Sequence, residues 1–337
     1  MMCRARALAA SLFVTVSAGA ALAEDPNSYP DPYGPATPWG NLPAGRHFGQ
    51  VIGVQPDRDG TSIWVFERCG DRYCPGTGIA PIDEFDAAGN LKRIIGEGLV
   101  VFPHGLWLDR DDNIWITDAD AKDGKGSQVF KLSPDGKVLM TLGKAGVEGD
   151  GPDVFDRPTF ALTAPNGDIF VADGHGKNDR IVKLAPDGTF IKAWGHHGGG
   201  PGEFAVPHSM ALDARGRLFV ADRSNNRVQI FDQDGNFLAA WKQFGRPSAV
   251  FIDQHDTLYV PDTESNEKTN PGFKRGIRIG SAEDGTVTAF VPDPTPYSPS
   301  ATGVGAGTGP EGLGVDDAGN IFGGETTEKA LVVFRKR

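Results

Sequence analysis

The chain has 337 residues and is acidic, with 44 Asp and Glu against 33 Lys and Arg and a formal net charge of −11. An acidic surface repels phosphate groups, so this balance excludes nucleic acid and anionic membrane surfaces as partners. Beyond the N-terminal residues, no stretch approaches about eighteen consecutive apolar residues, which excludes a membrane-spanning helix from the rest of the chain.

Residues 1–23 have the form of a secretory signal peptide. Arg4 and Arg6 precede an apolar run over 7–22, and the sequence Ala-Leu-Ala stands before Glu24. We therefore expect cleavage after Ala23 and a periplasmic or secreted protein. Cleavage removes two arginines and no acid, which leaves 31 basic against 44 acidic residues and a formal charge of −13.

A proline-rich segment over 24–45 follows, beginning EDPNSYPDPYGPATPWGNLP. This composition is typical of an extended arm or linker rather than of a core element.

Two cysteines, Cys69 and Cys74, remain after the signal peptide. In an oxidising compartment, two cysteines this close favour a disulfide that closes a small loop. A thiolate metal site is the alternative, although the intervening residues GDRY offer it no usual ligand beyond an Asp.

From residue 46 to 337 the chain repeats one pattern of short strands. It is clearest in FALTAPNGDIFVADGHGKNDRIVKLAPDGTF and MALDARGRLFVADRSNNRVQIFDQDGNF, where alternating apolar strands are separated by Gly-containing turns. Weaker copies begin near Val51, Pro103, Pro247 and Pro310, which makes six in all. Copies of about 40 to 60 residues with several strands each predict an all-β fold, a six-bladed β-propeller. Because the last copy is short, we expect an N-terminal strand within 46–54 to complete its blade.

The stretch WGHHGGGPGEFAVPHSMALDARGRLFVADRSNNRVQIFDQDG resembles an NHL repeat. It contains the Gly-rich turn, the Phe before the Pro, the Ala-Asp pair and the Asn-Arg-Val run. The resemblance implies that the propeller is of the NHL type.

One position in each repeat, directly after a proline, points to a functional site. In blades two to six it is occupied by His104, Thr159, His208, Ser248 and Glu311. Since the innermost strand of each blade lies beside the central channel, this position forms a ring of side chains around it, and the three potential ligands come from alternate blades. Two imidazoles and a carboxylate suit Zn²⁺ with open coordination sites, or Fe²⁺. The alternative is that the histidines only form hydrogen bonds in a hydrated channel.

Other residues recur at the strand ends without suggesting chemistry. Asp118, Asp173, Asp222 and Asp262 close the second strand of their blades, and such regular recurrence indicates local hydrogen bonding to backbone amides. We expect the recurring Arg180, Arg227 and Arg278 to link neighbouring blades by ion pairs. Insertions over 264–276 and 291–309 are candidates for a lid or a partner site.

More narrowly, the chain resembles peptidyl-α-hydroxyglycine α-amidating lyases. PHGLWLDRDDNIWITDAD, the following QVFKL and VPHSMAL carry this resemblance, which extends from about Ile52 to the C-terminus. It implies an enzyme that cleaves the C–N bond of a hydroxyglycine-type substrate to give an amide and glyoxylate.

The resemblance also implies roles for individual residues. His104 and His208 correspond to zinc ligands, and Arg68 corresponds to the arginine that meets the substrate carboxylate. The alternative for Arg68 is an ordinary surface arginine beside the disulfide. The third ligand of the family is a His followed by Asp, where this chain has Glu311 and then Gly312. A family tyrosine corresponds to His175 or its neighbour, and a His there can exchange protons near neutral pH.

Together these observations predict an exported, monomeric, metal-dependent lyase that acts on a small molecule or peptide with a carboxylate. One alternative is a non-catalytic propeller that binds a peptide or protein partner. Another is a lactonase-type propeller hydrolase with a metal in the channel. Fold alone does not separate these activities.

Overall fold

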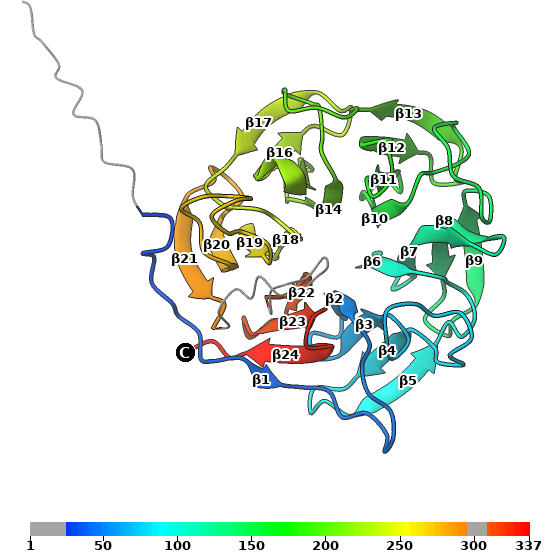
Figure 1. Ribbon diagram of the computed structural model, residues 1–337, viewed down its shortest axis with the longest axis horizontal. Coiled ribbons are helices and arrows are strands. Elements are labelled where there is room, and N and C mark those ends of the chain that lie inside the picture. Colours follow the sequence, from blue (N-terminus) through cyan, green and yellow to red (C-terminus); the bar gives the residue numbers. More distant parts are fainter. Residues whose placement is uncertain (1–24, 295–308) are drawn as a thin grey trace, which may run out of the picture.

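The computed structural model describes residues 25–294 and 309–337 and confirms the all-β six-bladed propeller. Six four-stranded antiparallel sheets surround a central channel (Figure 1). In the described residues, the helical structure is one 3₁₀ turn, Arg223–Asn225.

In blades one to five the strands run in chain order from the channel outward. Blade one consists of β2 (Val51–Pro56), β3 (Ile63–Glu67), β4 (Ile82–Phe85) and β5 (Leu91–Ile95). Blade two consists of β6 (Pro103–Leu108), β7 (Ile114–Lys122), β8 (Lys125–Leu132) and β9 (Val138–Leu142). Blade three consists of β10 (Pro158–Thr163), β11 (Ile169–Asp173), β12 (Arg180–Leu184) and β13 (Phe190–Trp194). Blade four consists of β14 (Pro207–Leu212), β15 (Leu218–Asp222), β16 (Arg227–Phe231) and β17 (Phe237–Trp241). Blade five consists of β18 (Phe251–Ile252), β19 (Thr257–Asp262), β20 (Gly276–Ser281) and β21 (Val287–Pro292).

Blade six is completed by a strand from the other end of the chain. Its sheet runs β22 (Gly312–Val315), β23 (Ile321–Glu325), β24 (Ala330–Phe334) and then β1 (Thr37–Pro38). An N-terminal strand closes the ring as predicted, but it lies at Thr37–Pro38 and not within 46–54. The apolar run that begins at Val51 forms β2, the buried inner strand of blade one. An outer edge strand needs few hydrogen bonds and tolerates proline, so a two-residue piece of the proline-rich arm completes the ring.

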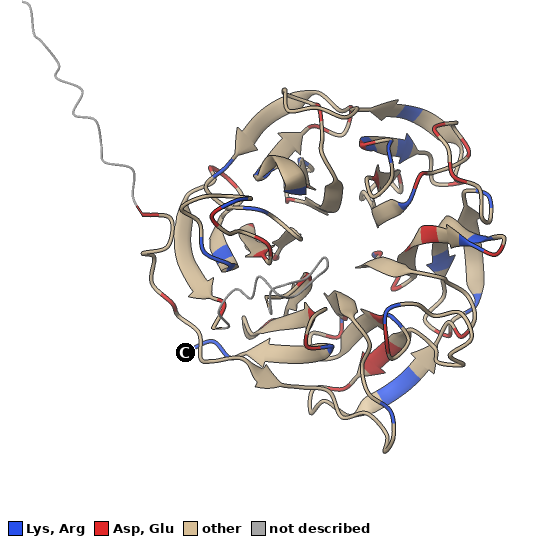
Figure 2. Ribbon diagram, viewed as in Figure 1, with Lys and Arg blue, Asp and Glu red and all other residues tan. Residues whose placement is uncertain are grey.

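The inner strands are apolar and almost free of charge. None of β2, β6, β10, β14, β18 and β22 contains Lys, Arg, Asp or Glu, as Figure 2 shows along the channel. The outer strands are much more exposed, with β13 as an example. Each junction between neighbouring blades has its own hydrophobic cluster. The ring is therefore held together by packing between blades, and charged groups at the channel stand on the ends of strands or on loops.

The acids at the ends of the second strands form local hydrogen bonds, as predicted. Asp118 accepts from the backbone amides of Val101 and Phe102, at 2.8 and 2.7 Å. Equivalent bonds run from the amides of Asp156, Ala205 and Arg246 to Asp173, Asp222 and Asp262. These buried carboxylates tie the segment before each inner strand to the blade, which fixes where the inner strand begins.

The recurring arginines pair within their own blades, so the prediction that they link neighbouring blades was wrong. Arg180 Nε lies 3.0 Å from Asp173 Oδ2, and Arg227 Nε lies 2.7 Å from Asp222 Oδ2. Arg278 pairs in the same way with the equivalent acid of blade five. The antiparallel register places each of the first two arginines directly opposite its acid on the neighbouring strand, where side chains are close enough to pair.

The disulfide between Cys69 and Cys74 is present, as predicted. Of the sequence predictions, the signal peptide over 1–23 and most of the insertion over 291–309 lie outside the described residues. Within the described part of the chain, no helix has the length and apolar character needed to cross a membrane.

Candidate metal centre

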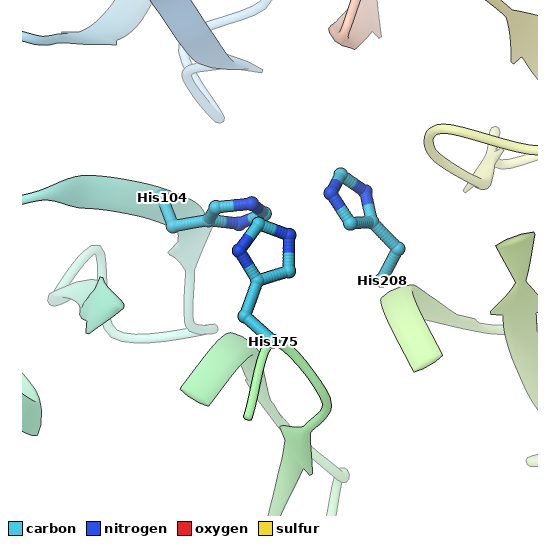
Figure 3. A group of neighbouring side chains, drawn as sticks. All are labelled: His104, His175 and His208. Atoms are coloured by element: carbon cyan, nitrogen blue, oxygen red, sulfur yellow. The ribbon is translucent and has the colours of Figure 1, made fainter. Parts of the chain in front are cut away.

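Three histidines converge at one end of the channel (Figure 3). His104 stands on β6 and His208 on β14, while His175 stands on the loop that follows β11. The ring centroid of His104 lies 4.5 Å from that of His175 and 4.6 Å from that of His208. One ring nitrogen from each histidine lies within 4.8 Å of the other two. This is the spacing at which a single ion can contact all three.

One ring nitrogen of each histidine is left without a hydrogen bond among the described residues. Nε2 of His104, His175 and His208 is buried in each case and has no hydrogen bond within the described part of the chain. Buried polar atoms are normally paired, so three unpaired ones at a single point call for a ligand. Three imidazole nitrogens fit a divalent metal ion such as Zn²⁺, which binds three protein ligands and keeps a position for water or substrate.

The charge state of the histidines also suits a metal. Burial lowers the pKa of all three imidazoles well below the usual range. The nearby guanidinium of Arg223 lowers the pKa of each further, and that of Arg68 adds to the effect at His104. The histidines are therefore neutral at ordinary pH, and neutral imidazole is the form that binds metal ions.

The orientation of two of the rings is set by backbone carbonyls. Nδ1 of His104 lies 2.7 Å from the carbonyl oxygen of Thr159, and Nδ1 of His208 lies 2.6 Å from that of Ser248. A carbonyl only accepts, so Nδ1 carries the proton in both rings. Such a bond fixes the tautomer and leaves Nε2 free to bind a metal.

Two glycines place His175. A Cβ at Gly174 would lie 2.2 Å from the Pro207 carbonyl oxygen, and one at Gly176 would lie 2.1 Å from Cγ of Asp156. The backbone amide of His175 donates to the carbonyl of Arg157 at 3.1 Å. The loop is thus packed tightly against two neighbouring segments, and the Gly-His-Gly sequence is what allows the imidazole to reach the other two.

Glu311 lies beside the three histidines and is paired with an arginine. Its Oε1 is 3.4 Å from Nε2 of His208 and 3.2 Å from Nη1 of Arg223, and Thr263 Oγ1 donates to Oε2 at 3.4 Å. Burial raises the pKa of Glu311, while Arg223 acts in the opposite direction. The sequence predicted His104, His208 and Glu311 around the ion; in the structure the closest group of three contains His175, and Glu311 stands next to it.

Arg68 is a buried residue of the site and not a surface arginine. It is 8% exposed, its Nε donates to the Pro103 carbonyl at 3.1 Å and its Nη1 donates to Oε1 of Gln50. Its guanidinium carbon lies 3.7 Å from the centre of the Phe102 ring. Burial lowers the pKa of Arg68 to about 9. Among the described residues no carboxylate lies within ion-pair distance of it, so its charge is available to an anion.

Arg223 was missed by the sequence analysis. It is 6% exposed and belongs to the turn that follows β15, just after Asp222. His175 occupies a similar place, two residues after the end of β11. The loops after the second strands therefore also reach the channel. The sequence signal for this was a His or Arg within two residues of a strand-end Asp.

Beneath the imidazoles the channel is narrow and apolar. A cavity of about 50 Å³ is lined by His104, His208 and Glu311 at its polar end and by residues such as Leu106 and Met210 further in. A low-dielectric floor strengthens electrostatic interactions at the site.

Comparison with known proteins agrees with the repeat pattern. A family model described as NHL repeat matches residues 204–231, which lie in blade four. Among solved structures, a gluconolactonase from Xanthomonas campestris superposes with a TM-score of 0.57 at 14% identity, over 91% of this chain and 99% of that one. At this identity the likeness concerns the fold alone.

Several curated relatives are amidating enzymes. The mouse peptidyl-glycine alpha-amidating monooxygenase is 36% identical over 211 residues, which cover 55% of this chain and 21% of that protein. The Drosophila melanogaster peptidyl-alpha-hydroxyglycine alpha-amidating lyase 1 is 38% identical over 164 residues, covering 45% of this chain and 29% of its own. A probable peptidyl-alpha-hydroxyglycine alpha-amidating lyase of Caenorhabditis elegans is 32% identical over 204 residues, 55% of this chain and 56% of that one.

The chain thus matches about a fifth of the mouse protein and about half of the nematode protein. The repeat, the six blades and these relatives lead to one assignment: the chain is an NHL-repeat β-propeller similar in sequence to peptidyl-α-hydroxyglycine α-amidating lyases.

Proposed function

We propose that the protein is an exported metal-dependent lyase that cleaves the C–N bond of an α-hydroxyglycine-type substrate. The observation that carries this proposal is the convergence of three buried, unpaired Nε2 atoms, from His104, His175 and His208. The lyase relatives give the class of reaction. The disulfide supports export, because such bonds persist in oxidising compartments.

The metal is zinc, with Fe²⁺ as the second choice for this ligand set. When bound, it would polarise the hydroxyl oxygen of the substrate as a Lewis acid. His104 and His208 keep the ligand roles inferred from the sequence, and the geometry favours His175 as the third ligand.

Arg68 binds the substrate carboxylate. Its guanidinium is held in one orientation by Phe102, Gln50 and the Pro103 carbonyl. Pro103 directly precedes His104, so this cation is fixed at the edge of the histidine cluster. A guanidinium and a carboxylate form a strong, charge-assisted pair, which orients the substrate for reaction.

Glu311 is the group placed to move the proton. Its Oε1 lies next to Nε2 of His208, and burial raises its pKa, which brings a carboxylate closer to the range needed for general-base catalysis. The sequence assigned proton transfer to His175 and a ligand position to Glu311. The geometry favours the reverse distribution of these two roles.

The reaction balances without an oxidant. The hydroxyl loses its proton, and the O–H electron pair forms the carbonyl of glyoxylate. The electrons of the breaking C–N bond pass to nitrogen, which takes up a proton and leaves as the amide. One molecule of substrate gives one amide and one glyoxylate.

Metal content and glyoxylate release test the proposal together. We expect about one equivalent of zinc or iron in the purified protein, strongly reduced in His104→Ala and His208→Ala, and glyoxylate from N-benzoyl-α-hydroxyglycine. A metal-free protein that stays inactive when zinc is supplied would overturn the enzyme in favour of a binding propeller. A metal-loaded protein that hydrolyses a sugar lactone but releases no glyoxylate would favour the lactonase-type reaction.

A further inference from the structure

The residue directly after the recurring proline forms a ring around the channel. In blades two, four and six it is His104, His208 and Glu311, and the two blades between them carry a hydroxyl residue at this position. These are Thr159 in blade three and Ser248 in blade five, both buried. The backbone carbonyl of each accepts from the histidine of the preceding blade, and its hydroxyl contacts a residue that adjoins or contacts the following ring position. This alternation suggests a purpose for the hydroxyl residues.

Thr159 joins the two metal-binding strands. Its carbonyl oxygen lies 2.7 Å from Nδ1 of His104, and its hydroxyl lies 2.6 Å from the carbonyl oxygen of Pro207. Pro207 is the residue directly before His208 in the chain. One residue thus holds the ring of the first histidine through its backbone and the strand of the second through its side chain.

A second hydroxyl, that of Thr117, helps to fix the position of the Thr159 carbonyl. Thr117 Oγ1 donates to the Thr159 carbonyl at 3.0 Å and accepts from the amide of Gly105 at 2.7 Å. Thr117 and Thr159 are both fully buried. With no water to replace a lost bond, the position of the Thr159 carbonyl depends on these contacts.

Ser248 repeats the arrangement one step further around the channel. Its carbonyl accepts from Nδ1 of His208 at 2.6 Å, and its hydroxyl lies 2.5 Å from Oγ1 of Thr263. Thr263 in turn donates to Oε2 of Glu311 at 3.4 Å. The chain of contacts therefore runs from His104 through Thr159, His208 and Ser248 to Glu311.

We propose that Thr159 is a positioning residue that sets the separation of His104 and His208, and that Ser248 does the same for His208 and Glu311. The inference rests on the proposed metal site. Groups that orient metal ligands in this way affect metal affinity by about 10–100-fold when they are removed. Thr159 touches neither metal nor substrate, and its effect passes through the two histidines.

The test is zinc affinity, measured by competition with a chromophoric chelator, in Thr159→Val and Thr159→Ser. Valine has the shape of threonine without its hydroxyl, so it removes the bond to the Pro207 carbonyl. We expect Thr159→Val to bind zinc about 10–100-fold more weakly than the wild type, and Thr159→Ser to bind it as the wild type does. The visible spectrum of the Co²⁺-loaded proteins gives a second readout, because it follows ligand geometry independently of activity.

Ser62→Ala serves as the matched control. Ser62 is 2% exposed and its hydroxyl donates to Asp59 in blade one, remote from the histidines. Its loss is expected to lower thermal stability while zinc affinity and the Co²⁺ spectrum remain those of the wild type.

A folded Thr159→Val protein with wild-type zinc affinity would overturn the proposal and reduce Thr159 to a stabilising residue. If Thr159→Val does not fold, Thr117→Val replaces it, since Thr117 donates to the same carbonyl; unchanged zinc affinity in that folded variant would equally overturn the proposal. Failure of the wild type to bind zinc would instead overturn the proposed metal site, and this inference with it.

Discussion

The carboxylate of Glu311 and the guanidinium of Arg223 form a buried ion pair at the end of the channel, with Oε1 and Nη1 separated by 3.2 Å. Their side chains are only 7% and 8% exposed. Removing one member of such a pair leaves the other charge buried without compensation, which is far more costly than losing a surface contact.

Arg223→Gln is therefore expected to lower the free energy of unfolding by about 3–5 kcal/mol, measured by urea denaturation of the metal-free protein. Arg215→Gln is the control, because Arg215 pairs with Glu283 on the surface, where both side chains are more than half exposed. That change is expected to leave the free energy of unfolding nearly unchanged, because solvent screens an exposed ion pair. Equal losses in the two variants would contradict the buried pair.

Zinc is expected to stabilise the folded protein through the three histidines. A ligand that binds only the native state adds about 2.7 kcal/mol at a hundred times its dissociation constant. Thermal unfolding with and without a chelator should show this difference in the wild type and not in His208→Ala. A chelator effect that persists in His208→Ala would place the metal elsewhere.

The metal-free protein is expected to lose stability as the pH falls below about 6.5, the usual pKa of histidine. Because burial lowers the pKa of His104, His175 and His208, the native state keeps them neutral while the unfolded chain binds protons. Stability therefore rises with pH through this range and is complete above it.

Other buried groups titrate too, so the measurement is the difference between the wild type and a variant with all three histidines changed to glutamine. Unfolding free energies at pH 5 and pH 8 give the result. A wild type that depends on pH no more strongly than the variant would contradict the neutral, buried state of the histidines.

Arg68→Gln is expected to reduce kcat/KM for hydroxyglycine substrates by about 10–100-fold, since a hydrogen bond to a charged group contributes about 1.5–3 kcal/mol. Zinc should still bind, because Arg68 supplies no ligand atom to the histidine cluster. Arg72→Gln is the control, because Arg72 lies nearby in the loop closed by the disulfide and is exposed. If both substitutions had the same kinetic effect, a general electrostatic contribution would replace the specific role of Arg68.

Gly174→Ala is expected to displace the loop that carries His175. Its Cβ would lie 2.2 Å from a backbone oxygen, an overlap that typically costs about 1–3 kcal/mol, and zinc should bind more weakly. At Gly199 the nearest atom to an added Cβ is 3.9 Å away, so Gly199→Ala should behave as the wild type in both measurements. Normal zinc affinity in Gly174→Ala would show that His175 is not a ligand.

The repeat register was sufficient to place His104 and His208 on inner strands at the channel. Both follow a proline at the same point of a recurring strand pattern, and side chains at equivalent points of successive blades meet around the axis. The repeat register could not predict that His175, rather than Glu311, forms the closest group of three with His104 and His208. This grouping depends on how a loop between Gly174 and Gly176 packs on the next blade, which has no periodic signal.

The closing strand was missed for a related reason. Thr37 and Pro38 are exposed and form a strand of only two residues, whereas the segment beginning at Val51 is an apolar run that is buried as an inner strand. Arg223 lies in the turn after β15, outside the position after proline that marks the ring around the channel. Periodicity reports strands that bury a face, and it carries little information on short edge strands or on loops that reach a site.

The pairing of β1 with β24 also determines the order in which the molecule can be assembled. Thr37 lies opposite Val333, 296 residues further along the chain. A ribosome delivers the first of these partners near the start of synthesis and the second almost at its end, whereas blades one to five each consist of consecutive strands that can pair as they emerge. Blade six is thus the last to form, and until it does, the edge strand of the arm has no place to bind.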